Sequence, residues 1–157
     1  MLGRRILHDT IFPQFETKTT LTAAQAAGIF VTEFDVLPAI PGYLTRPILF
    51  HVNKEAGAYT IAGVTALQLI NGTIADNFPQ MGIAPSGFLD SASDITFANV
   101  LKGNGLSADF GVMNISIATN KKLALRTTGA ALSGAGGNLN VTVIYTLIPV
   151  KYAFPSA

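Results

Sequence analysis

The sequence of 157 residues contains no cysteine and no tryptophan, and both absences narrow what the protein can be. Without cysteine there are no disulfide bonds, no thiolate ligands for zinc and no cysteine nucleophile. The missing Cys and Trp landmarks also count against an immunoglobulin-like sandwich. A sugar-binding site would have no tryptophan on which a sugar ring could stack.

Charged residues are scarce as well. Ten basic and nine acidic residues make up 12% of the chain, about half of the quarter that is usual for soluble domains. The net charge is +1, and only Arg4-Arg5 and Lys121-Lys122 place two basic residues together. Nucleic-acid binding needs a clustered basic surface, so we expect no nucleic-acid partner. A chain with so few charges either forms a compact all-β domain or covers part of its surface with other chains, and we favour the second.

Long apolar runs are also missing. The mean hydropathy is positive, at +0.43, but no stretch approaches the roughly eighteen apolar residues that a membrane-spanning helix needs. The first residues, MLGRRILHDTIFPQF, lack the apolar core of a signal peptide. We therefore expect neither a membrane partner nor export.

The clearest pattern present is a long strand near the C-terminus. A glycine-rich segment, Gly134–Gly137, is followed by LNVTVIYTLIP, in which apolar residues recur at every second position. This period predicts a strand with one buried face. The buried face would consist of Leu139, Val141, Val143, Tyr145 and Leu147. The other face changes from Asn and Thr to Ile, so we expect one end of it to meet water and the other end to be covered.

Similar but shorter patterns recur along the chain and are separated by turn residues. They include 30–37, 43–53, 65–70, 95–101, 112–119 and 123–127. Pro47 predicts an edge or a bulge in the second of these strands, because proline cannot donate to a strand ladder. Thr22 and Gln25 have capping-box spacing before a short helical turn. Residues 73–93 show no clear pattern, and a hidden strand or a functional loop would each explain them.

These segments predict an all-β fold with almost no helix. Strands at regular spacing favour an antiparallel β-sandwich over an α/β fold. We expect a jelly-roll-like sandwich of about eight strands, with an immunoglobulin-like sandwich as the second choice. Residues 18–157 would form this single domain, and residues 1–17 would form an extended N-terminal arm. The arm carries large apolar side chains that should pack on its own domain or on a neighbour: Ile6, Leu7, Ile11, Phe12 and Phe15.

The residues that could carry chemistry form no convincing site. His51 precedes Asn53 where the metal motif of cupins has a second histidine, and the only other histidine is His8. Glu33 and Asp35 share a strand face, which more often marks a solvent-facing edge or a salt bridge between proteins than a catalytic pair. Gly134–Gly137 has no following helix and no Lys-Ser/Thr, so it reads as a hairpin turn rather than a phosphate loop. We predict no catalytic residue, metal site or cofactor.

Two long stretches together resemble the capsid decoration, or cement, proteins of tailed bacteriophages. The first is LTAAQAAGIFVTEFDVLPAIPGYLTRPILFHVN (21–53), continued by AYTIAG (58–63) and ALQL (66–69). The second is KLALRTTGAALSGAGGNLNVTVIYTLIP (122–149). The resemblance lies in turn and strand patterns and covers about two thirds of the chain, without the arm and without residues 73–111.

The resemblance implies a jelly-roll-like virion protein with no enzymatic activity. Such a protein forms dimers or trimers, binds the outside of the phage head and stabilises contacts between subunits of the major capsid protein. It would be made in the host cytoplasm and end on the exterior of the virion. The alternative is a receptor- or glycan-binding module of a head or tail fibre, for which Tyr43, Tyr59, Phe78 and Phe88 are the candidate aromatics. A cupin-like enzyme comes third.

Overall fold

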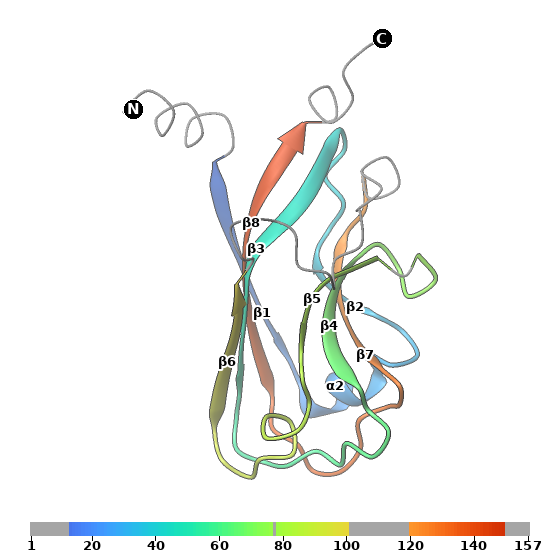
Figure 1. The fold of residues 1–157 in the computed structure, drawn as a ribbon, viewed down its shortest axis with the longest axis vertical. Coiled ribbons are helices and arrows are strands. Elements are labelled where there is room, and N and C mark those ends of the chain that lie inside the picture. The colour runs from blue at the N-terminus through green and yellow to red at the C-terminus, as the bar shows by residue number, and fades with distance from the viewer. Residues whose placement is uncertain (1–12, 77, 101–119, 150–157) are drawn as a thin grey trace.

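The structure, a computed structural model, describes residues 13–76, 78–100 and 120–149 and forms an antiparallel β-sandwich (Figure 1). A single short helix accompanies its eight strands in this part of the chain. The elements are β1 (Gln14–Leu21), α2 (Ala23–Gly28), β2 (Phe34–Leu37), β3 (Tyr43–Lys54), β4 (Ala66–Asn71), β5 (Phe78–Ile83), β6 (Ile95–Val100), β7 (Leu123–Thr128) and β8 (Leu139–Pro149).

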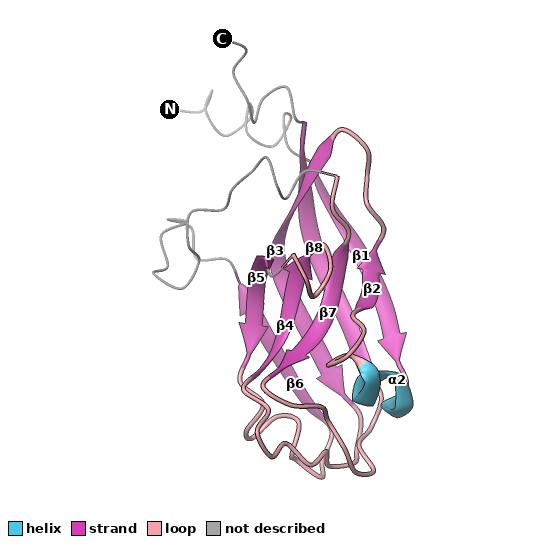
Figure 2. Cartoon of the chain, turned by 90° about the vertical axis from the view of Figure 1, so that its right-hand side faces the viewer, coloured by secondary structure: helices cyan, strands magenta, loops and turns pink. Residues whose placement is uncertain are grey.

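The strand order confirms the predicted jelly roll. One sheet has the order β1-β8-β3-β6 and the other has the order β2-β7-β4-β5. Every connection except β4–β5 therefore passes from one sheet to the other, which gives the two packed sheets of a jelly roll rather than an immunoglobulin-like sandwich. Figure 2 shows the β2-β7-β4-β5 sheet in front of the other sheet, with α2 at one end of the sandwich.

The predicted C-terminal strand is the centre of its sheet. β8 pairs along its length with β1 on one side and β3 on the other. Its inward face is buried as expected, because Leu139, Val141 and Val143 are at most 1% exposed. The outward face is half-buried from Asn140 to Ile144. The long β3 bulges between Pro47 and Leu49, which confirms the bulge that the proline predicted.

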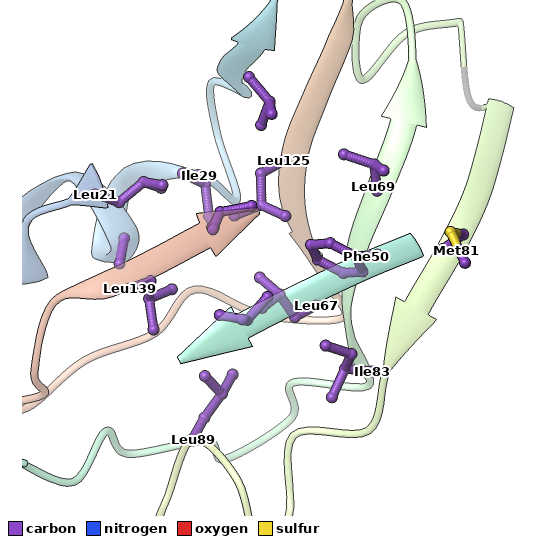
Figure 3. Packing of buried hydrophobic residues seen from close by; sticks show 14 of the residues in the cluster. Leu21, Ile29, Phe50, Leu67, Leu69, Met81, Ile83, Leu89, Leu125 and Leu139 are labelled. Carbon is purple, nitrogen blue, oxygen red and sulfur yellow. The ribbon is translucent and has the colours of Figure 1, made fainter. Parts of the chain in front are cut away.

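The core lies between the two sheets and is formed by side chains from both. Figure 3 shows Phe50 of β3 and Leu139 of β8 facing Leu67 and Leu125 from the opposite sheet. All four side chains are completely buried. Burial of large aliphatic and aromatic groups at about 25 cal/mol per Å² supplies most of the driving force for folding. Burial alternates with a period of two along β8 from Leu139 to Tyr145, whereas β7 is buried on both faces from Leu123 to Thr127.

Helix α2 forms where the capping box predicted a helical turn. The Thr22 hydroxyl accepts a 3.3 Å hydrogen bond from the Gln25 N–H, and the Gln25 side chain accepts a 2.9 Å bond from the Thr22 N–H. Both bonds satisfy amide groups that a helix start leaves unpaired. The helix buries Ala26 and is followed by the buried Ile29. It therefore closes one end of the sandwich.

Several sequence expectations are corrected by the structure. The strand predicted over 30–37 is confined to β2, because the chain still turns at Val31 and Thr32, whose N–H groups donate to Gly28 O. The unpatterned residues 73–93 contain β5. The glycine-rich segment 134–137 is no hairpin turn, since it joins β7 and β8 of different sheets.

The sandwich also begins inside the segment predicted as an arm. Gln14–Leu21 form β1, so residues 14–17 pair with β8. The remaining arm residues 1–12 and the strand predicted over 112–119 lie outside the described part of the chain.

Candidate interaction surfaces

Of the predicted arm side chains, only Phe15 lies in the part that the structure describes. It is opposite Tyr145 of β8, and the two rings stack with centroids 5.7 Å apart. Phe15 is nevertheless 40% exposed. Just before it, the carbonyl of Pro13 accepts a 3.2 Å hydrogen bond from the Thr146 hydroxyl. The root of the arm is therefore attached to β8 by a ring contact and a hydrogen bond. Ile6, Leu7, Ile11 and Phe12 lie outside the described residues.

The outer face of the β1-β8-β3-β6 sheet carries a row of polar side chains in register across all four strands. Thr20 is opposite Asn140, Asn140 is opposite Asn53, and Asn53 is opposite Thr96. The side chains are also hydrogen-bonded to one another, at 2.7 Å for Thr20–Asn140, 3.4 Å for Asn140–Asn53 and 3.0 Å for Asn53–Thr96. Cross-strand pairs of this kind hold strands in register.

Glu55, just past the end of β3, completes this row. Its two carboxylate oxygens accept hydrogen bonds of 3.0 Å from Asn140 and 2.9 Å from Asn138. The amide of Asn140 is therefore engaged within the sheet. The hydrogen bonds of this row connect its side chains across the four strands of the sheet.

Further along the same outer face the side chains become apolar. The neighbouring position of β8 is Thr142, opposite His51, and the next is Ile144, opposite Leu49. All four residues are half-buried. No described strand or helix covers this face in Figure 1. Along β8 this face thus changes from an amide at Asn140 to an aliphatic side chain at Ile144, and the next pair is Thr146 with Arg46.

His51 lies within this face, between Thr142 of β8 and Ala98 of β6. In residues 13–76, 78–100 and 120–149, no three His, Cys, Asp or Glu side chains are grouped as metal ligands. In the same ranges no helix is long and apolar enough to cross a membrane. His8 lies outside these ranges.

For Glu33 and Asp35 the sequence indicated a solvent-facing edge or a salt bridge between proteins; Asp35 does lie on the edge strand β2 with its side chain 56% exposed, and both carboxylates form ion pairs within the chain. Lys122, just before β7, contacts Glu33 at 3.0 Å and Asp35 at 2.5 Å. Glu33 also accepts a 3.2 Å hydrogen bond from the N–H of Ile74. These contacts join β2, β7 and the β4–β5 connection, so they stabilise one end of the β2-β7-β4-β5 sheet.

The protonation of this cluster follows from its contacts. Burial alone would raise the pKa of Glu33, but the hydrogen bonds from Lys122 and Ile74 outweigh it and leave the pKa below its ordinary value. The hydrogen bond with Asp35 raises the pKa of Lys122, against the opposing effect of burial, and Glu33 adds to the rise. The ion pairs are therefore intact near neutral pH and are not suited to proton transfer there.

The sequence pattern did not single out the buried Lys54. This lysine is completely buried at the end of β3. Its ammonium group donates to the carbonyl oxygens of Glu55, Gly57, Ser91 and Ser93 at 2.8–3.1 Å. Burial lowers the pKa of Lys54, and the nearby Asp94 carboxylate raises it in opposition. A signal did exist, because period two places Lys54 on the inward face with Phe50 and Val52.

Two of the four aromatics considered for glycan binding belong to the core. Tyr59 is 3% exposed and Phe88 is completely buried, so neither can stack on a sugar. Tyr43 is 37% exposed at the start of β3. The side chain of Phe78 lies outside the described part of the structure. Of the four aromatics predicted for glycan binding, Tyr43 is therefore the one described side chain that is exposed.

No protein-family model matches this chain, and a search of curated proteins found no match to it.

Proposed function

We propose that the protein is a non-enzymatic structural component of a tailed-phage virion, which binds the outside of the head and stabilises contacts between subunits of the major capsid protein. The proposal combines the decoration-protein resemblance of residues 21–53, 58–63, 66–69 and 122–149 with the jelly-roll architecture. The attached root of the N-terminal arm is the observation that carries it. The virion exterior, the capsid protein as partner and the homo-oligomer are parts of this proposal.

The root matters because binding through a loose terminal segment costs conformational entropy. Phe15 and Pro13 are held on β8 by the Tyr145 ring and the Thr146 hydroxyl. A segment that starts from a fixed point samples fewer positions, so less entropy is lost when it binds. Four large apolar residues precede this point in sequence: Ile6, Leu7, Ile11 and Phe12. They supply apolar surface that a neighbouring subunit can bury.

The mechanism is mechanical rather than chemical. Each copy bridges capsid subunits and buries apolar surface across their boundary, and a standard interface covers about 1,600 Å² in total. Repetition by the symmetry of the shell makes the binding avid. Expansion or rupture of the head must then separate these interfaces as well as those between capsid subunits. The low content of charged residues agrees with a surface that is covered by other subunits in the assembled particle.

The test is binding to purified heads that lack the protein. Deleting residues 1–12 removes the arm and leaves β1, which begins at Gln14, intact. We expect the deletion to abolish sedimentation with heads and to lower the temperature at which the heads rupture to that of undecorated heads. Replacing Ile6, Leu7, Ile11 and Phe12 with serine should have the same effect.

The matched control changes the charge of the arm instead of its apolar groups. Arg4→Gln with Arg5→Gln keeps the apolar residues, so head binding should stay near that of the unchanged protein. The proposal is overturned if the intact protein does not bind heads, or if the truncated protein binds them equally well. Circular dichroism of each variant, compared with the unchanged protein, confirms that the sandwich is folded.

A further inference from the structure

The two sheets end in four edge strands, and three of these carry features that oppose pairing with another strand. β1 bears Glu16 and Lys18, whose side chains are 51% and 68% exposed. β2 has only four residues and a register shift after Asp35. β5 contains Pro79 and has an irregular register with β4. Charge, short length, proline and bulges are the usual protection of edge strands against association.

The fourth edge strand, β6, has none of these features. Its sequence ITFANV contains no charged residue, no proline and no glycine. It pairs with β3 at six consecutive positions without a register shift. No strand in the described ranges pairs with its other edge, and Figure 1 shows β6 at the margin of its sheet. Within the described ranges, β6 is thus a regular strand whose outer edge carries none of these protective features.

An exposed aromatic ring marks the same strand. Phe97 is 43% exposed, more than any other aromatic residue in the described part of the chain. One side of its ring packs against Phe88, with centroids 5.5 Å apart. The exposed remainder lies at the rim of the core, beside the free edge of β6. A strand that paired with this edge would bring apolar groups close to the ring.

We propose that β6 pairs antiparallel with β6 of a second copy of the chain, about a two-fold axis, with Phe97 opposite Phe97 of the second copy. Antiparallel partners directly opposite each other lie on the same face of a sheet. Two identical strands therefore pair only with odd-numbered positions opposite odd-numbered ones. The Phe97 register meets this condition and joins the two four-stranded sheets into one.

A second copy fits this edge better than the other three edge strands in residues 13–76, 78–100 and 120–149 do. β1, β2 and β5 would each bring a charge, a bulge or a proline against β6, whereas β6 itself brings none. Pairing β6 with itself also places no like charges together. A pair of strands this short buries less than the roughly 800 Å² per partner of a standard interface. The dimer should therefore be weak and depend on concentration.

This proposal names the self-association surface of the proposed homo-oligomer and rests on that part of the proposed function alone. Its test uses the full chain in solution without heads, so it can fail while head binding succeeds, and the reverse. We expect sedimentation velocity to show a monomer–dimer equilibrium within about 10 μM to 1 mM, the weak range expected of a small interface.

A lysine on the exposed face of β6 should break the dimer. Ala98 is exposed, and Ala98→Lys would give β6 the protection that Lys18 gives β1. We expect the dissociation constant to rise about tenfold or more, because each lysine must be desolvated beside the partner strand. Gln14→Lys, at an exposed position on the β1 edge, is the matched control and should leave the equilibrium unchanged. Equal melting temperatures for the two variants would show that the fold is intact.

Cysteine cross-linking gives a second readout, because the natural chain has no cysteine. Directly opposite Cβ atoms lie about 4.5–5.5 Å apart in antiparallel pairs, near the distance that a disulfide needs. Phe97→Cys should form a covalent dimer under mild oxidation, and Glu16→Cys on β1 should not.

Three results would overturn the proposal. The first is a monomer at 1 mM, and the second is a dimer that Ala98→Lys leaves unchanged. The third is a protein whose β6 amides gain hydrogen-exchange protection only on phage heads, which would assign this edge to a foreign strand.

Discussion

The hydroxyl of Tyr59 donates a 2.5 Å hydrogen bond to the carbonyl oxygen of Gly137, which lies 78 positions further along the chain. Around it, Gly137 N–H donates to Gly57 O, and Thr60 forms an isolated bridge with Ser133. The β3–β4 and β7–β8 connections are therefore packed together at one end of the sandwich. The buried hydrogen bond from Tyr59 to Gly137 therefore joins the two connections at this end of the sandwich.

Tyr59→Phe should lower the free energy of unfolding at neutral pH by about 1–2 kcal/mol, because the Gly137 carbonyl then loses its buried donor. The experiment is urea denaturation followed by circular dichroism. Tyr43→Phe changes an exposed tyrosine and is the control, with an expected effect within about 0.5 kcal/mol. Equal effects of the two substitutions would contradict a role for the Tyr59 hydroxyl.

The same residue should make stability fall at alkaline pH. Burial raises the pKa of Tyr59 to about 12, from an ordinary value of 10.0. The folded state holds the Tyr59 proton more tightly than the unfolded state does. The protonated hydroxyl therefore stabilises the fold fully below pH 10, and this stabilisation is lost as the pH rises from 10 to 12. The natural protein should lose about 2–3 kcal/mol more than Tyr59→Phe across that range. Parallel curves of unfolding free energy against pH for the two proteins would contradict this.

Gly136→Ala should be strongly destabilising. A Cβ at this position would lie 2.2 Å from the ring of Tyr59, so the ring or the loop must move, at a cost of about 2 kcal/mol or more. Gly28→Ala is the matched control, since nothing lies within 4 Å of its added Cβ, and it should be neutral or slightly stabilising.

Thermal unfolding of the two glycine variants measures this difference: Gly136→Ala should lower the melting temperature and Gly28→Ala should not. The clash should also disappear in the double variant Gly136→Ala with Tyr59→Ala, which would show a favourable coupling energy. Additive effects in this cycle would mean that the ring is not the cause.

Lys54→Met should destabilise the protein by about 3 kcal/mol or more. Methionine has a similar shape, but it leaves four carbonyl oxygens in a partly buried site without the ammonium that bonds them. Hydrogen bonds to a charged group contribute about 1.5–3 kcal/mol each when an unpaired partner remains buried. Lys18→Met removes a lysine whose side chain is 68% exposed and should change stability by less than about 0.5 kcal/mol. Denaturant midpoints of the two variants give the comparison, and similar midpoints would disprove a stabilising carbonyl cage.

Acid should weaken the ion-pair cluster at β2 and β7. Hydrogen bonds outweigh burial and lower the pKa of Glu33 in the folded state. In the β4–β5 connection, Asp76 accepts a hydrogen bond from the Thr73 N–H and pairs with Lys121 at 2.9 Å, and these contacts lower its pKa as well. The contribution of each is therefore present above its ordinary pKa, near pH 4, and is lost as the pH falls through its lower folded value. Glu33→Gln should cost up to about 1 kcal/mol at pH 6 and make stability less dependent on pH between 5 and 3. Glu16→Gln is the control, because Glu16 belongs to an exposed ion pair with Lys18. The prediction is contradicted if the stability of both variants falls with acid as much as that of the unchanged protein.

Local patterns predicted much of this fold correctly. The alternation in β8 identified its buried face, Pro47 indicated the bulge in β3, and Thr22 with Gln25 predicted the start of α2. Each of these signals depends on neighbours within a few residues, either through the period of two or through a side chain that reaches its own backbone. The same reasoning failed at Phe30 and Val31, where alternation resembled a strand but the chain was still completing the turn after the helix.

The glycine-rich segment shows where local reasoning ends. Its composition indicated a tight turn, and a hairpin was the simplest interpretation. The glycines serve instead for close approach, because side chains at Gly136 and Gly137 would collide with the Tyr59 ring and with the Glu55 carbonyl. Those partners come from the β3–β4 connection, which no pattern within the segment could reveal.

The amino-acid sequence by itself determined that the protein is a β-sandwich poor in charge, because strand period, turn residues and composition are properties of short stretches. Tertiary structure alone decided that Lys54 is enclosed by carbonyl groups and that Glu33 and Asp35 share Lys122. It also decided that, among the described strands, β6 lies at a sheet edge without the charges that β1 carries. The physical reason is that burial, ion pairing and edge position depend on which distant segments the strand order brings together.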